Sequence, residues 1–259
     1  MTDKDVERRR YDERARSLRA AANPMLSIHG GSSAVALHLR DPYERYESLI
    51  AESVGPGSKV LEIGAGTGQF TGTALSSGAE VVATDISSAS LDVLSDRYGE
   101  AEVALTVCVA DMEALPFDDA SFDCVTSAGS LSYGDNETVL FEIFRVLRPG
   151  GRFICVDSLN HNPIFRANRW VHFVRGRRSR STLLRMPTTT LIDRYRETFG
   201  KVEVQFFGSL AWIMPVAVRF FGSNRARHLS NWFDRSFRVT RSAFKFVMVA
   251  TKKTGNARS

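Results

Sequence analysis

Between residues 59 and 157 the chain alternates short apolar segments with helical ones. The apolar segments are rich in Val, Ile and Phe, and Gly, Pro, Asp or Ser flank each of them, which is typical of buried strands. Five strands are predicted, at residues 59–63, 80–84, 104–109, 122–127 and 152–157. Helices are predicted between several of them, at residues 69–77, 88–98 and 135–147. This alternation predicts an α/β fold, with a parallel sheet that helices cover on both faces.

The segments on either side of this alternation have a different character. A polar helix is predicted at residues 3–22, where an Asn-Pro pair ends it, because the residue before a proline is pushed out of the helical region. A second helix is predicted at residues 41–53, with Asp41 as its N-cap and Pro42 at its first position. Basic insertions separate the first five strands from two later ones, at residues 202–207 and 243–251.

A glycine-rich turn, VLEIGAGTG at residues 60–68, joins the first predicted strand to the helix that follows it. Glycines there let the backbone adopt positive φ and approach a ligand closely. The second strand ends in Asp85, at the distance expected of an acid that accepts hydrogen bonds from a ribose, and the third ends at Asp111. Ligands of open α/β sheets bind outside the carboxyl ends of the strands. The pattern therefore predicts a ribose-containing ligand, and a glycine turn of this kind fits dinucleotide enzymes too.

Four segments occur in order within residues 58–158: VLEIGAGTG, VVATDIS, ADMEALPFDDASFDCVTSAGSL and FRVLRPGGRFICVDS. In these segments the sequence resembles the class I S-adenosylmethionine (SAM)-dependent methyltransferases. The resemblance implies a Rossmann-like sheet of seven mostly parallel strands, whose last strand, here 243–251, is antiparallel. A nicotinamide enzyme has no reason for the Asp-Met and Leu-Arg-Pro-Gly-Gly elements, and it more often shows the spacing G-x-G-x-x-G.

With this resemblance, the chain divides into three parts. Residues 1–57 are predicted to form an N-terminal helical cap, and residues 58–158 the SAM-binding core. Residues 159–259 hold the basic insertions after the fifth and sixth strands together with the final two strands. We expect this last part to complete the same domain as the core.

The resemblance also assigns residues to the cofactor, SAM. Glu62 and the glycine-rich loop would hold its methionyl end, and Asp85 would bind both ribose hydroxyls, with Ile86 against the adenine. Asp111 would accept a hydrogen bond from the adenine amino group, and Met112 would pack on the ring. The full set comprises Glu62, Gly64, Ala65, Gly66, Thr67, Gly68, Asp85, Ile86, Asp111, Met112, Ser127, Ala128 and Gly129.

Methyl transfer to a hydroxyl benefits from a general base, for which histidine is the usual residue. His161 lies just beyond the fifth strand, where loops face the cofactor, so we expect it to be the catalytic base; a capping role is the alternative. His29, in the N-terminal loop, is the second candidate. Arg40 and Tyr43 are predicted to position the substrate, and no metal site is predicted. Two tyrosines are further pocket candidates, Tyr11 and Tyr133.

The two parts of the chain carry opposite charge. Residues 1–159 hold 14 Lys and Arg against 25 Asp and Glu, whereas residues 160–259 hold 20 against 4. The basic part includes Arg177, Arg178 and Arg180, which we expect to bind an anionic acceptor, because arginine forms paired hydrogen bonds with phosphates and carboxylates. Interleaved aromatic and basic residues fit an acidic glycan, a lipid-linked substrate at a membrane surface, or RNA. A solvated basic face is the alternative interpretation.

The segment SLNHNPIFRANRWVHFVRGRRSRSTLLRMP is also similar to methyltransferases of bacterial surface-polysaccharide clusters, which favours a sugar hydroxyl as the acceptor. The leading prediction is a SAM-dependent methyltransferase that O-methylates a sugar or another small anionic or lipid-linked acceptor. An RNA methyltransferase is the alternative, although no appended RNA-binding module is evident. A non-catalytic binding protein of the same fold is a second alternative.

Targeting signals and cysteines bear on the compartment. No apolar run approaches the roughly 20 residues that cross a bilayer, and the charged N-terminus lacks the apolar stretch of a signal peptide. Cys108, Cys124 and Cys155 lie in apolar runs without metal-ligand spacing, so we expect buried, reduced thiols. These features predict a cytoplasmic protein, with peripheral contact at the inner face of the membrane left open.

Overall fold

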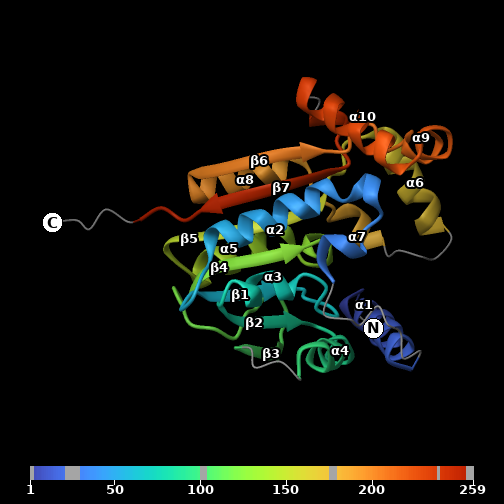
Figure 1. The fold of residues 1–259 in the computed structure, drawn as a ribbon. Coiled ribbons are helices and arrows are strands. Elements are labelled where there is room, and N and C mark those ends of the chain that lie inside the picture. Colours follow the sequence, from blue (N-terminus) through green and yellow to red (C-terminus); the bar gives the residue numbers. More distant parts are fainter. Residues whose placement is uncertain (1–2, 21–29, 100–103, 175–179, 238–239, 255–259) are drawn as a thin grey trace.

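The computed structural model describes residues 3–20, 30–99, 104–174, 180–237 and 240–254. Its centre is a seven-stranded sheet with the strand order β3-β2-β1-β4-β5-β7-β6 (Figure 1). The strands are β1 (Lys59–Ile63), β2 (Glu80–Asp85), β3 (Leu105–Val109), β4 (Phe122–Ala128), β5 (Leu147–Ser158), β6 (Lys201–Phe207) and β7 (Lys245–Thr251). The first five are parallel, and β7 is antiparallel to both of its neighbours. The predicted α/β fold with an antiparallel last strand is thus confirmed.

The helices lie on both faces of this sheet (Figure 1). They are α1 (Asp3–Ala20), α2 (Asp41–Ser53), α3 (Thr71–Ser76), α4 (Ser88–Tyr98), α5 (Asn136–Val146), α6 (Pro163–Val174), α7 (Arg180–Leu184), α8 (Thr189–Phe199), α9 (Met214–Phe221) and α10 (Ser223–Ser236). Short 3-10 turns include η3 (Leu37–Leu39) and η4 (Leu131–Tyr133). Helices α6 to α8 connect β5 to β6, and α9 and α10 connect β6 to β7.

Successive residues of the central strand β1 contribute to two separate cores. Val60 packs with the apolar residues of α2, α3 and α4, while Leu61 packs with those of α5 and α8. Strand side chains alternate between the two faces of a sheet, so a strand covered on both sides is mostly apolar. Four of the five residues of β1 are buried: Val60, Leu61 and Ile63 are apolar, and the fourth is the acid Glu62.

The observed strand ends agree with the predicted ones to within two residues, except at the start of β5. β5 begins at Leu147, earlier than predicted, because the Leu-Arg-Pro-Gly-Gly turn already pairs with β4 through Leu147 and Phe122. Cys124 and Cys155 are buried free thiols as expected, but Cys108 is only half-buried, because it lies on the edge strand β3.

The prediction that Asp41 caps helix α2 is wrong. The helix begins at Asp41 itself, so the N-cap position belongs to Arg40. One of the Asp41 carboxylate oxygens instead accepts from Nε and an Nη of Arg227 on α10, at 2.8 and 2.6 Å. The acid therefore ties the N-terminal part of the chain to the insertion between β6 and β7, a distant contact that local sequence does not reveal.

Gly68 illustrates how tightly the glycine-rich loop packs. Its φ is +75°, and a Cβ there would lie 2.7 Å from Cγ of Leu94 on α4. Gly57 has a similar φ of +81°, but a Cβ on it would meet no atom within 4 Å. Gly68 is therefore needed for both its conformation and its size, and Gly57 for its conformation alone.

We expect Gly68→Ala to lower the free energy of unfolding by about 2–5 kcal/mol, because left-handed strain and overpacking add. Gly57→Ala, the matched control, should cost only the strain, about 1–2 kcal/mol. Urea denaturation of both variants measures the difference. Equal losses in the two variants would contradict the packing role of Gly68.

Candidate functional site

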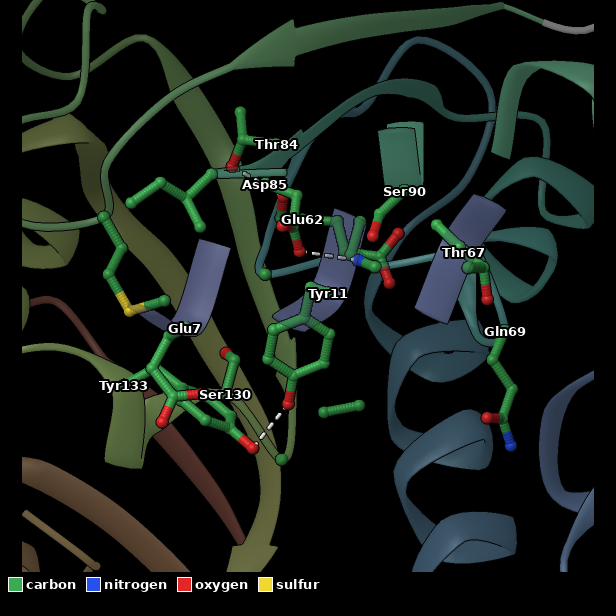
Figure 2. Close-up of a pocket in the computed structure, with 18 of the residues that line it drawn as sticks. Glu7, Tyr11, Glu62, Thr67, Gln69, Thr84, Asp85, Ser90, Ser130 and Tyr133 are labelled. Carbon is green, nitrogen blue, oxygen red and sulfur yellow. Dashed lines mark hydrogen bonds between the residues drawn. The ribbon is translucent and has the colours of Figure 1, made fainter. Parts of the chain in front are cut away.

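A cavity of about 310 Å³ opens at the carboxyl edge of the sheet, where β1, β2 and β4 end. Its walls are the glycine-rich loop, the end of β2, the loop after β3 and the residues after β4. Side chains of α1 close the remaining side, as Figure 2 shows for Glu7 and Tyr11. Small-molecule sites commonly measure about 300–1,000 Å³. The cavity is therefore large enough for a ligand of cofactor size.

Asp85 ends β2 and holds the glycine-rich loop in place. Its Oδ2 accepts from the backbone N–H of Gly66 and its Oδ1 from that of Ser87, each at 2.9 Å. Burial raises the pKa of this carboxyl, and the two backbone hydrogen bonds oppose the rise. A carboxylate oxygen accepts more than one hydrogen bond. Asp85 can therefore support the loop and still accept from a ligand in the cavity.

Glu62 is a buried acid at the base of the same cavity. Its Oε2 accepts from Oγ1 of Thr71 at 2.6 Å. Burial raises the pKa of Glu62 to about 7, the Thr71 hydrogen bond lowers it, and the nearby Asp85 carboxylate raises it further. A cationic group beside Glu62 would favour its ionised form.

Three glycines bring bare backbone to the cavity or permit a close approach between loops. A Cβ on Gly66 or Gly129, both at positive φ, would meet no protein atom within 4 Å. Gly64 is needed for a different reason, because a Cβ at this position would clash with Cβ of Ser130. Ser130 in turn bonds Ser127, with 2.6 Å between the two Oγ atoms. The loop after β4 is thus packed directly against the loop after β1.

Helix α1 closes the cavity through polar contacts along its length. Nζ of Lys4 lies 2.5 Å from the Asp111 carboxylate and 2.6 Å from that of Glu113. Asp12, two turns further on, accepts from Oγ of Ser87 at 2.6 Å. These contacts join the N-terminal helix to the loops after β2 and β3, where the sequence predicted the cofactor residues.

Two tyrosines meet across the cavity. Oη of Tyr11 on α1 donates to Oη of Tyr133 on η4 at 2.5 Å, and the rings make an edge-to-face contact (Figure 2). Burial raises the pKa of Tyr11, and the neighbouring Tyr133 raises it further. Tyr11 is therefore protonated near neutral pH and acts as a hydrogen-bond donor.

Eleven of the predicted cofactor residues line this cavity. They are Glu62, Gly64, Ala65, Gly66, Thr67, Asp85, Ile86, Asp111, Met112, Ala128 and Gly129. Gly68 and Ser127 do not line it, because Gly68 packs against α4 and Ser127 bonds Ser130. The cofactor roles of all thirteen residues stay predictions.

Several lining residues of α1 were not assigned from the sequence. They are Lys4, Glu7, Arg14, Ala15 and Leu18. With Tyr11, the residues Glu7, Ala15 and Leu18 follow each other at spacings of three or four, which places them on one side of a helix. This stripe was the sequence signal that could have predicted a buried side of α1. It is hard to recognise because most of the other residues of the helix are charged.

His161 lies outside the cavity lining. Its Nε2 accepts from the backbone N–H of Thr189 at 3.0 Å and lies 2.7 Å from Oγ1 of the same residue. Thr189 is the first residue of α8, so the imidazole holds the start of that helix, as the capping alternative proposed. The structure does not bring His161 to the predicted cofactor residues, and its catalytic role stays a prediction. His29 lies outside the described residues.

The predicted substrate residues are not in the cavity lining either. An Nη of Arg40 donates to the Ser33 carbonyl at 2.9 Å and so closes a surface loop. The Tyr43 ring stacks on Phe70, with 5.2 Å between the ring centroids, and Phe70 lines the cavity. Arg177 and Arg178 lie outside the described residues, and Arg180, the first residue of α7, has no described side chain.

Comparison with known proteins identifies the domain. The family described as "Methyltransferase domain" matches residues 61–155. Residues 61–155 thus match a methyltransferase domain. The ubiquinone/menaquinone biosynthesis C-methyltransferase UbiE of Laribacter hongkongensis is 37% identical over 117 residues, which cover 44% of this chain and 48% of that protein. The demethylmenaquinone methyltransferase of Renibacterium salmoninarum is 36% identical over 131 residues, covering 49% and 53%. The chain thus spans about half the length of these relatives.

Solved structures share the fold of this chain. Phosphoethanolamine N-methyltransferase 2 of Haemonchus contortus, in complex with SAM, matches with a TM-score of 0.60 and 18% identity, over 82% of this chain and 53% of that one. Geranyl diphosphate C-methyltransferase of Streptomyces coelicolor matches with a TM-score of 0.55 and 19% identity, over 82% and 80%. At these identities the comparison supports the fold alone.

The cofactor of this kind of domain is SAM, and the cavity suits it in two respects. SAM carries a positively charged sulfonium, and the cavity is lined by the acids Glu62, Asp85 and Asp111. The open space in front of Gly66 and Gly129 leaves backbone accessible where a side chain would otherwise stand. Within the described residues there is no cluster of His, Cys, Asp and Glu arranged for a metal ion. Their helices include none long and apolar enough to cross a membrane.

The Glu62 carboxyl makes the stability of the ligand-free protein depend on pH. Its pKa is about 7 in the folded protein against an ordinary value of 4.5. The folded state therefore binds the proton more tightly than the unfolded one. The resulting stabilisation is full below the ordinary value and is lost as the pH rises through about 7.

Glu62→Gln should remove this pH dependence. At pH values above the Glu62 pKa, it should raise the free energy of unfolding by about 1–3 kcal/mol relative to the wild type. Denaturant titrations across this pH range measure it, with the exposed Glu80→Gln as control. An unchanged pH profile in Glu62→Gln would show that Glu62 titrates normally.

Proposed function

We propose that this chain transfers the methyl group of SAM to a small-molecule acceptor that binds beside Tyr11 and Tyr133. The supporting observation is the cavity under α1, in which eleven predicted cofactor residues meet those two phenols. When bound, the cofactor supplies an electrophilic methyl group on a positively charged sulfur. The chain itself binds and aligns the two reactants, which accounts for a large part of the rate enhancement in such displacements.

Each acid of the cavity has a distinct task in this proposal. Asp85 would accept from the ribose hydroxyls, and its hydrogen bond to the Gly66 N–H holds the loop beside it. Glu62 would lie near the cationic sulfur of the cofactor. Asp111 is held by Lys4 and by the backbone N–H of Glu113, so it presents an already oriented carboxylate to the adenine.

The cavity offers an acceptor both hydrogen-bonding phenols and carboxyl groups. Tyr11 and Tyr133 would orient the ring oxygens of an aromatic quinol, whose ring carbon would act as the nucleophile. When that carbon takes the methyl group it releases its own proton, which a carboxylate of the cavity lining or water would accept. The two quinone-pathway relatives named above therefore support C-methylation of a quinol-like acceptor.

O-methylation of a sugar or another anionic acceptor stays a prediction from the sequence. The sugar acceptor rests on the similarity of one segment to methyltransferases of surface-polysaccharide clusters. The anionic acceptor rests on Arg177, Arg178 and Arg180, whose side chains the structure does not describe. None of the relatives and structures named above has a polysaccharide in its name. The acceptor experiment below tests it beside C-methylation.

Asp85→Asn tests the cofactor site. The change keeps the shape of the side chain but removes its charge, so we expect SAM binding to weaken by about 1.5–3 kcal/mol. Isothermal titration calorimetry measures this, with Asp92→Asn, an exposed acid on α4, as the matched control. Unchanged SAM affinity in Asp85→Asn, or tight NADH binding by the wild type, would contradict the proposal.

Tyr11→Phe tests the acceptor side. The wild type is incubated with SAM and either a naphthohydroquinone or glucuronic acid, and mass spectrometry identifies any methylated carbon or oxygen. Loss of one neutral hydrogen bond should raise the KM for the methylated acceptor about 2–10-fold and leave SAM affinity unchanged. Tyr195→Phe, a buried tyrosine of α8, is the control. Methylation of glucuronic acid alone would favour O-methylation, and an unchanged KM would remove Tyr11 from acceptor binding.

A further inference from the structure

The segment formed by α9, α10 and the residues that flank them exposes several large apolar side chains to solvent. Seven of these side chains are between 38% and 73% exposed: Ile213, Val216, Phe220, Phe221, Leu229, Trp232 and Phe237. We call these seven residues the aromatic surface. Contiguous exposed apolar patches commonly mark sites of interaction with a protein or a membrane.

Helix α9 is apolar on two sides, and only one of them is covered. Met214 and Ala217 are buried against Ala226 of α10 and form a small core of their own. Val216 and Phe220 lie one turn apart and are 54% and 73% exposed. The inner side already accounts for the packing of the helix, so folding alone does not explain the outer one.

The charges beside the aromatic surface are basic. Arg219 and Arg225 are exposed, α9 contains no acid, and Asp234 is the one acid of α10. Asp234 is turned inward, where its carboxylate accepts from the backbone N–H groups of Gly208 and Ser209 at 2.7 and 3.0 Å. Arg227 is likewise turned inward, to Asp41 and Glu44. The solvent-facing side of these two helices therefore combines apolar side chains with the positive charges of Arg219 and Arg225.

The topology places this surface at the same edge of the sheet as the cavity. β5 and β6 are both antiparallel to β7, so β6 is parallel to β5 and its carboxyl end lies at the edge where the cavity opens. Helix α9 follows that end of β6, and α6 follows the same end of β5 (Figure 1). Helix α6 adds an exposed Trp170, 62% accessible, and an exposed Arg166.

We propose that the aromatic surface docks onto an anionic lipid membrane. Amphipathic helices that lie in the bilayer interface combine Trp, Phe and Leu with basic residues, as these do. Lipid tails would cover the apolar side chains, while acidic headgroups neutralise Arg219 and Arg225. This inference rests on α9 and α10 and does not depend on the proposed methyl transfer.

Two other partners fit the same surface less well. A second copy of the chain in a two-fold dimer would place identical basic surfaces against each other, without an outward acid among these helices to offset them. RNA would stack on the aromatic rings, but Ile213, Val216 and Leu229 offer no ring for a base. Burial in lipid is the arrangement that uses the aliphatic and aromatic members together.

Co-sedimentation with vesicles tests the proposal. The wild type should bind vesicles of equal parts phosphatidylcholine and phosphatidylglycerol, and bind vesicles of phosphatidylcholine alone more weakly. Phe220→Ser with Trp232→Ser should lower the partition coefficient about tenfold or more, because two exposed rings lose their burial in lipid. Arg219→Gln and Arg225→Gln should each lower it about fivefold, and only with the anionic vesicles.

Matched controls keep the outcome independent of folding and of catalysis. Phe141→Ser on α5 removes an equally exposed ring, 61% accessible, and Lys201→Gln removes a charge at the opposite edge of the sheet. Both should bind vesicles like the wild type, and all variants should keep SAM affinity. Absence of vesicle binding, or equal losses in controls and variants, would overturn the proposal. The proposal would also be overturned if the wild type formed a dimer in analytical ultracentrifugation, or bound RNA, and Phe220→Ser abolished that dimer or that RNA binding without weakening vesicle binding.

Discussion

The candidate functional site depends on the parallel pairing of β1 with β2 on one side and with β4 on the other. This register places Ile63, Asp85 and Ala128 at one edge of the sheet, where the three strands end. The carboxylate of Asp85 then bonds the Gly66 N–H of the loop that leaves β1. A cavity wall is thereby assembled from segments that are distant in sequence, and no single segment could form it alone.

The core of the fold was predictable because its strands are covered on both faces. Such strands read as apolar runs, and β1 was placed with its observed ends. The glycine-rich loop was predictable for a different reason, because its glycines at positive φ form a local sequence pattern. The role of Asp41 was not, because its partner Arg227 lies on a helix 186 residues away. Local sequence favours capping at such a residue, and only the tertiary contact decides.

The candidate site was predictable on its sheet side and poorly predictable on its helix side. Residues such as Asp85 follow strands at regular spacing, whereas α1 contacts the cavity through a stripe hidden among charges. His161 is the converse case, a residue that the sequence placed in the site and the structure places outside the cavity lining. Its position after β5 suggested chemistry, but the imidazole is used by the first turn of α8. Which way a loop side chain turns depends on the helix packed behind it, and the strand pattern carries no information about that helix.

The antiparallel β7 has a practical consequence for anyone who wishes to attach this protein to a support. The last residue of β7, Thr251, pairs with Arg152 on β5. This pair lies at the edge of the sheet remote from the cavity. Lys4, by contrast, lies directly against Asp111 in the cavity wall. A label or surface linker joined beyond Thr251 therefore leaves α1 undisturbed, whereas one joined just ahead of Lys4 stands beside the entrance to the site.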